Sequence, residues 1–211
     1  INVTAVNTSA AGWLRVWPCG APEPATSSVN YMTRGAIEPN AVVVPVDASG
    51  EMCVSSLVDT EVIVDLSGWF DAGLQPGSGR FVDTRDDGAT RSVVPGVPLR
   101  VAVTRQFGVP GDGSAVGVSL NVTAVNPSGP GWLRVWPCNS PEPGTSSVNY
   151  MTRGAIEPNA VVVPVDASGE VCISSLVDTE VIVDLSGWFD AGLQSGAGRV
   201  VDTRTGLGPI P

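Results

Sequence analysis

The sequence contains no histidine and no lysine. Histidine is the commonest general base and the commonest transition-metal ligand, so its absence excludes Ser-His-Asp and Cys-His catalytic sites and histidine-bound zinc in this chain. Without lysine, Schiff-base chemistry and Lys–Asn isopeptide cross-links are also excluded. Covalent reinforcement of the fold must therefore come from cysteine.

Charged residues are scarce, at 15% of the chain, and the formal net charge is −10. Nucleic-acid binding requires clustered cations, whereas the basic residues here are 11 arginines spread along the chain, so we exclude nucleic acid as a partner. No apolar run reaches about 18 residues, so we expect no membrane insertion.

What the sequence does contain is 43% hydrophobic residues, with 25 glycines and 18 prolines lying between apolar runs. This combination predicts many short strands joined by turns. The length of 211 residues leaves room for one or two domains.

The octapeptide GWLRVWPC at residues 12–19 returns unchanged at residues 131–138. It belongs to a longer repeat, because residues 1–86 match residues 120–205 without an insertion and differ at only about 13 positions. Most exchanges replace one apolar residue by another or fall at turn positions, as two copies of one packed unit would tolerate. The chain is therefore a tandem repeat.

Alternation and turn residues predict eight strands in the more complete unit. They are expected at 81–84, 98–104, 115–125, 131–136, 146–151, 160–166, 170–175 and 180–189. In the third strand, Leu120 and Val122 should face the core, and Asn121 and Thr123 a polar surface. Pro164 predicts a sheet edge or a bulge.

Strands of this number and spacing, without helical periodicity, predict an all-β fold of two tandem β-sandwiches of the immunoglobulin-like or jelly-roll-like kind. The alternative is a β-trefoil, since the repeat is close to three times the trefoil subrepeat in length. We found no threefold similarity inside the unit to support it.

The phase of the repeat predicts the domain boundaries. We expect a first unit at 1–79 that lacks its N-terminal part, a complete second unit at 80–190, and a linker with the opening strand of a further unit at 191–211. The glycine-rich stretch 72–79 and its copy are the expected linkers. As a hypothesis, residues 199–211 complete the first unit of the next molecule by strand addition, which gives head-to-tail assembly.

Each copy holds two cysteines, and we expect the disulfides Cys19–Cys53 and Cys138–Cys172. Closing a loop of about 34 residues would stabilise each unit by roughly 3–4 kcal/mol on the chain-entropy model. A metal site is the alternative, but two thiols without histidine are too few ligands. Disulfides imply an oxidising, extracellular setting.

In a strand, the residues Trp13, Arg15 and Trp17 would share one face, with a guanidinium between two indoles. This face is either a ladder that stiffens the sheet or an aromatic platform for sugar rings or a neighbouring unit. The candidate ligand or partner contacts are Trp13, Arg15, Trp17, Trp69, Trp132, Arg134, Trp136 and Trp188.

No carboxylate pair has a context that indicates catalysis. The candidates in the first copy are Glu61, Asp65, Asp71 and Asp83, and a salt bridge with Arg85 is the simpler account of the last. Calcium ligands could come from turns at 47–51 and 86–88, which do not match the EF-hand pattern and contain ordinary turn residues, so calcium binding stays open. We expect no enzyme activity and no cofactor.

The series NVTAV (121–125), GWLRVWPC (131–138), SSVNY (146–150), GEVC (169–172), VIVDLSGWF (181–189) and RVVDTR (199–204) resembles a repeat domain of secreted, actinobacterial-type proteins. The resemblance covers nearly the whole chain. It implies an extracellular module attached to cell-wall enzymes or strung along surface proteins, with no assigned catalytic residue. The chain departs from it by lacking the opening of its first unit.

Together these features predict a non-enzymatic structural or adhesive repeat of a bacterial surface protein or extracellular filament. Its expected partners are copies of itself or adjacent repeats. The alternative is a carbohydrate-binding module that uses its surface tryptophans on cell-wall or environmental glycan.

Overall fold

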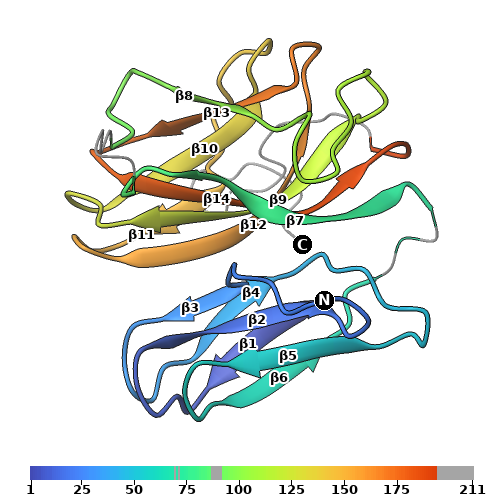
Figure 1. Cartoon of the computed structure of the whole chain (residues 1–211). Coiled ribbons are helices and arrows are strands. Elements are labelled where there is room, and N and C mark those ends of the chain that lie inside the picture. The colour runs from blue at the N-terminus through green and yellow to red at the C-terminus, as the bar shows by residue number, and fades with distance from the viewer. Residues whose placement is uncertain (69, 71, 87–91, 194–211) are drawn as a thin grey trace, which may run out of the picture.

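The computed structural model describes residues 1–68, 70, 72–86 and 92–193. Within these ranges the chain forms strands and no helix, and the strands make four antiparallel sheets. The sheets pair into two β-sandwiches that lie one above the other (Figure 1). The predicted all-β sandwich fold is confirmed, and the alternative trefoil is not observed.

The first unit consists of two three-stranded sheets, in the orders β4-β1-β6 and β3-β2-β5. Its strands are β1 (Asn2–Val6), β2 (Gly12–Pro18), β3 (Val29–Tyr31), β4 (Glu38–Ala41), β5 (Met52–Ser56) and β6 (Glu61–Asp65).

The second unit consists of two four-stranded sheets, in the orders β12-β9-β14-β7 and β11-β10-β13-β8. Its strands are β7 (Leu74–Asp83), β8 (Leu99–Ala102), β9 (Gly117–Val125), β10 (Gly131–Pro137), β11 (Val148–Tyr150), β12 (Ile156–Pro164), β13 (Glu170–Ser175) and β14 (Glu180–Phe189). Strands β9 to β14 repeat β1 to β6, so β7 and β8 are the additional strands. Each extends one sheet at its edge.

The eight predicted strands correspond to β7 through β14, but β7 and β12 begin several residues earlier than predicted. Strand β7 begins at Leu74, so most of the expected linker 72–79 is paired with β14. The glycines there serve close packing, since a Cβ on Gly79 would lie 2.2 Å from the ring of Phe107. As expected from Pro164, β12 lies at a sheet edge.

The core of each unit lies between its two sheets. In the second unit, alternate residues of β9, such as Leu120 and Val122, meet Leu133 and Val135 of β10. The first unit has a smaller cluster built from the corresponding positions, including Val3, Ala5, Leu14, Val16, Val29 and Tyr31.

The repeated octapeptide forms β2 and β10, the central strands of their sheets. Its leading glycine makes room for a tyrosine, because a Cβ on Gly131 would lie 2.8 Å from Cε2 of Tyr150. The hydroxyl of Tyr150 donates to the Trp132 carbonyl and hydrogen-bonds with Ser175 and Thr179 at 2.8 and 2.9 Å. This buried group of hydrogen bonds joins three strands of one sheet.

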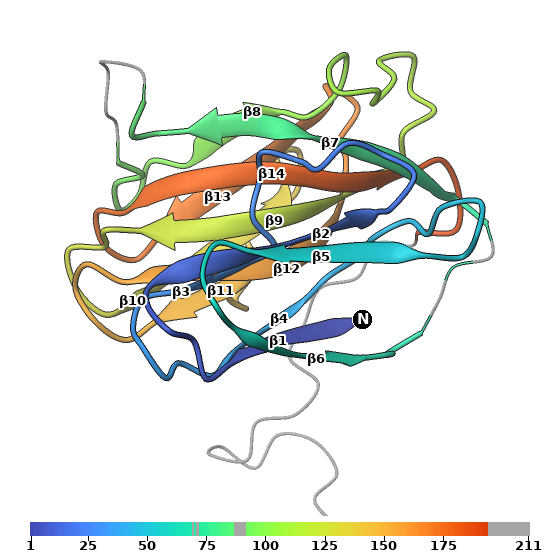
Figure 2. The ribbon, with the colours of Figure 1, turned by 60° about the horizontal axis from the view of Figure 1, so that its bottom comes forward.

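Strands β6 and β14 have the same sequence, but their side chains differ greatly in the fraction exposed to solvent. Val64 is 40% exposed whereas its counterpart Val183 is fully buried, and Leu66 is 71% exposed whereas Leu185 is 2% exposed. Two parts of the second unit have no counterpart in the first: β7, which lies along β14, and the segment 92–116, which adds residues such as Val101 and Val109 to the core. In the described chain β6 has β1 on one side and no strand on the other (Figure 2).

The two units contact each other through the outer face of the β12-β9-β14-β7 sheet. The sequence predicted that Asn121 and Thr123 would face a polar surface, but they are buried, at 5% and 3% exposure. That expectation is wrong because the first unit covers this face. Strands β3 and β4 of the first unit lie against β12.

Candidate functional site

The pairing of β7 with β14 is fixed by a charged cluster at its centre. The guanidinium of Arg80 on β7 donates to the carboxylate of Asp184 on β14, with Nε 2.8 Å from Oδ1. Arg80 also contacts Asp83, which binds Arg85 in turn. These residues hold the edge strand β7 against its neighbour β14.

Burial raises the pKa of the Asp184 carboxyl, and the two hydrogen bonds from Arg80 offset part of that effect. In contrast, the hydrogen bond from the Arg85 guanidinium lowers the pKa of Asp83. Thr84 completes the contact, because its hydroxyl accepts a hydrogen bond of 2.8 Å from the Val181 N–H. The segment RFVDTR at 80–85 therefore binds β14 through the side chains of Arg80 and Thr84.

In the first unit, β6 corresponds to β14, but no strand of the described residues corresponds to β7. Asp65 occupies on β6 the position of Asp184 on β14, and it is exposed. Around it, Ile63 is 50% exposed, against 8% for its counterpart Ile182. We call this surface the β6 edge. Within the described ranges it combines backbone groups that face no neighbouring strand, apolar side chains and a carboxylate.

A second site lies where the units meet. The amide of Asn40 on β4 donates to the Oδ1 of Asn121 on β9 at 3.0 Å, and its own Oδ1 accepts from the Ala160 N–H at 3.1 Å. Asn121 donates to the Ser27 carbonyl at 2.8 Å. Both asparagines are buried. We call these three hydrogen bonds the asparagine contact.

The tryptophan and arginine side chains of β2 and β10 stack as the sequence predicted, but in pairs. The guanidinium carbon of Arg15 lies 3.9 Å from the centre of the Trp13 ring, and that of Arg134 lies 3.8 Å from Trp132. Each arginine also binds a glutamate. In the described chain Trp17 and Trp136 take no part in these cation–π contacts.

In the first unit this face is turned toward the second unit. Trp13 and Arg15 line a cleft of about 190 Å³ whose other wall includes Arg80 and Asp184. Trp17 lines a neighbouring cleft of about 260 Å³ with residues of β7 and β14. The aromatic face thus borders the unit junction.

The other two candidate tryptophans are placed differently. Trp188 is partly buried against the core of the second unit rather than standing free on the surface. Trp69 lies outside the described residues.

Both predicted disulfides, Cys19–Cys53 and Cys138–Cys172, are present. They link β2 and β10 to β5 and β13 and indicate an oxidising, extracellular environment. No helix among the described residues has the length and apolarity needed to cross a membrane.

Comparison with known protein families, with curated proteins and with solved structures gave no match. The function must therefore be argued from the chain itself.

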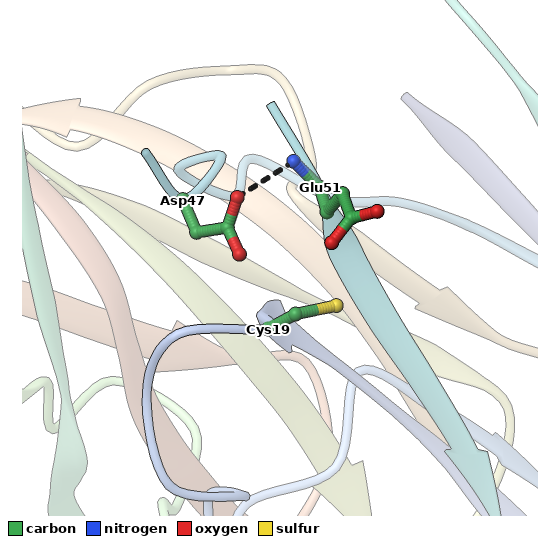
Figure 3. A group of neighbouring side chains, drawn as sticks. All are labelled: Cys19, Asp47 and Glu51. Atoms are coloured by element: carbon green, nitrogen blue, oxygen red, sulfur yellow. Dashed lines mark hydrogen bonds between the residues drawn. The ribbon is translucent and has the colours of Figure 1, made fainter. Parts of the chain in front are cut away.

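Beside the first disulfide lie three side chains of kinds that can bind a metal ion: Cys19, Asp47 and Glu51 (Figure 3). The Cys19 sulfur is bonded to Cys53 and is not a thiolate, which leaves two carboxylates. One oxygen of Asp47 accepts from the N–H groups of Ser49 and Glu51 at 2.8 and 2.9 Å. This arrangement is that of an Asx turn.

The structure places the carboxylates considered for catalysis in separate surroundings, as far as it describes them. Asp83 binds arginines, and Glu61 accepts a hydrogen bond of 2.7 Å from Asn7. Asp65 lies on the β6 edge, and Asp71 lies outside the described residues.

Sequence reasoning missed the asparagine contact. Its signal was present, since Asn121 stands on the polar face of an otherwise apolar strand. An amide there has to find partners once a neighbouring unit covers it.

Proposed function

We propose that the chain is a non-enzymatic structural repeat of an extracellular bacterial surface protein or filament, in which neighbouring copies join head to tail by sharing a strand. The observation that carries this proposal is the contrast between β14 and β6, which have the same sequence: β14 is completed by β7, whereas no strand of the described residues lies on the second side of β6. An exposed apolar sheet edge favours association with another strand.

The chain contains a second copy of the strand that fits this edge. Residues 193–204 read LQSGAGRVVDTR and correspond to LQPGSGRFVDTR at 74–85, which includes β7. In register with β7 on β14, Arg199 would meet Asp65, and Thr203 would meet the Val62 N–H. The strand from one copy would thereby place its apolar and charged groups against the β6 edge of the next.

Sedimentation velocity of the full chain and of a chain ending at Asp190 tests this proposal. The full chain should form oligomers whose size grows with concentration, and the shortened chain should stay monomeric. Equal behaviour of the two chains would contradict strand sharing. Circular dichroism and the unfolding midpoint of the shortened chain should match those of the full chain, which excludes loss of folding as the cause.

Glycan binding is the second candidate, favoured by the clefts that Trp13 and Trp17 line at the unit junction. Indole faces stack on sugar rings, and guanidinium groups bind hydroxyls. Titration with cell-wall oligosaccharides while following tryptophan fluorescence separates the two candidates. Saturable binding that is lost in Trp17→Ala would favour a carbohydrate-binding module, and a flat titration would favour the structural role.

A further inference from the structure

The junction between the two units is held by the asparagine contact, and each of its two sides has a counterpart elsewhere in the chain. We propose that the same contact joins successive copies of the chain, with Ser146 and Asn159 of one copy bound to Asn2 and Ala41 of the next. This inference rests on the proposed head-to-tail assembly and adds to the shared strand a second, independent docking surface.

The second unit provides Asn159, the counterpart of Asn40, and its amide is already oriented for binding, as the comparison with Asn40 shows. Asn40 donates one amide hydrogen to the Ser28 carbonyl of its own unit at 2.7 Å, which turns the rest of its amide toward Asn121. Asn159 makes the corresponding hydrogen bond to the Ser147 carbonyl, also at 2.7 Å. Its amide is therefore fixed in the same orientation. Asn159 is more exposed than Asn40 because no unit covers it in the described chain.

The side provided by the first unit repeats the geometry of its counterpart. Asn121 is the register partner of Ala160 in the β9–β12 pair, and Asn2 is the register partner of Ala41 in the β1–β4 pair. The Val42 N–H donates to the Ile1 carbonyl, so the N–H of Ala41 points to the outer side of β4. One amide side chain and one backbone donor are thus displayed together.

The surroundings of the two sides also correspond. Trp13 and Arg15 face Thr123 and Ile182 across the existing junction. The next junction would bring Trp132 and Arg134 over the counterparts on β1 and β6. The exposed isoleucine of the β6 edge, Ile63, would be covered as Ile182 is covered now. The second tryptophan–arginine pair would thereby gain a role as a partner contact.

The contact is heterologous, since the two sides are different surfaces of the unit. A heterologous contact leaves one free side at each end of every assembly, so copies add without limit unless the rotation closes a ring. A second copy of this chain carries both the asparagine side and the sequence of the matching strand.

A matched pair of substitutions tests the inference. Asn2→Asp replaces the amide donor by a carboxylate that would oppose the Ser146 carbonyl of the neighbouring copy. Among the described residues of its own chain the Asn2 side chain makes one hydrogen bond, of 3.4 Å to Thr4, so folding should be unaffected. Asn121→Asp makes the same chemical change at the junction inside the chain and leaves both intermolecular surfaces unaltered.

The measured quantity is the association constant from sedimentation equilibrium of the full chain. We expect Asn2→Asp to weaken association by at least about tenfold, since a buried hydrogen bond is lost and a buried carboxylate would face the carbonyl oxygen of Ser146 without a donor. We expect Asn121→Asp to change it by less than about threefold. Equal weakening by both variants would overturn the inference.

The outcomes also separate this inference from the proposed function. If the wild-type chain assembles and Asn2→Asp assembles equally well, the shared strand stands and the asparagine contact between copies is wrong. If the wild-type chain is monomeric at every concentration, both the proposed assembly and this inference fail.

Discussion

Asp65 and Asp184 hold the same position in two copies of one sequence, yet among the described residues an arginine of a neighbouring strand binds Asp184 and none binds Asp65. Asp184 is 2% exposed and lies 2.8 Å from Arg80, whereas Asp65 is exposed to solvent. The strands β6 and β14 have the same sequence, and β14 has the additional strand β7, whose Arg80 binds Asp184, beside it. Each unit thus serves as a control for the other.

Arg80→Ala should destabilise the second unit by roughly 2 kcal/mol, because it leaves the buried Asp184 carboxylate without a partner. The loss should be smaller than for a fully buried pair, since the Arg80 side chain is 35% exposed. Urea unfolding followed by circular dichroism measures the change.

Arg199→Ala is the matched variant for Arg80→Ala. It should leave the unfolding free energy of the monomer unchanged and weaken association by about tenfold, since Arg199 is expected to pair with Asp65 of another copy. A variant that unfolds like Arg80→Ala, or that assembles like wild type, would contradict the strand register.

Tyr150→Phe should cost about 0.5–1.5 kcal/mol in unfolding free energy, the usual net value of a hydrogen bond. The substitution removes a buried hydroxyl that joins Trp132, Ser175 and Thr179, and no water can reach their polar atoms to replace it. Tyr31→Phe removes the same hydrogen bonds in the first unit, where Ser56 is exposed and water can replace the lost hydroxyl. Its cost should therefore be smaller, and equal costs would contradict this account of the two environments.

The unit junction should respond to pH through Glu157. Burial raises the pKa of its carboxyl above the usual value of 4.5, and the nearby Glu38 carboxylate raises it further. The charged form is thus disfavoured in the folded chain, and this penalty is present at neutral pH and disappears as the pH falls through the raised pKa. Glu157→Gln should raise the thermal unfolding midpoint at pH 7. Its advantage over wild type should vanish below about pH 4.5, and a constant advantage across this range would contradict the assignment.

Much of the fold could be predicted from the sequence, because alternation in segments such as 115–125 and 180–189 marks strands whose one face is a core. The disulfides followed from the matched spacing of Cys19–Cys53 and Cys138–Cys172. Local patterns of this kind carry their information within a few residues or within one repeat.

The remaining features depend on contacts between distant segments. The stretch 74–79 has the composition of a linker, and it is a strand because Gly79 fits against Phe107. Likewise, Asn121 is buried only because another unit covers it. The position of Asn121 on an apolar strand indicates that its amide needs partners, but the sequence alone does not specify which unit lies on which face, so Asn40 and Ser27 could not be predicted as those partners.

The most direct test of strand sharing is a cross-link between two chains. Val183 pairs with Val82 in the β14–β7 ladder, so Val64 of one copy should lie opposite Val201 of another. Opposed residues in antiparallel strands have Cα atoms about 4.5–5.5 Å apart, which suits a disulfide. A mixture of Val64→Cys and Val201→Cys chains, carrying different mass tags, is oxidised and analysed by mass spectrometry. A mixture of Val64→Cys and Asp202→Cys chains is the control, because its cysteines would be one residue out of register and on opposite faces.

The account predicts that the disulfide-linked heterodimer of Val64→Cys and Val201→Cys exceeds the control heterodimer by about tenfold or more and disappears on reduction. Equal yields in the two mixtures, or no heterodimer in either, would contradict the claim that one copy completes the β6 edge of the next.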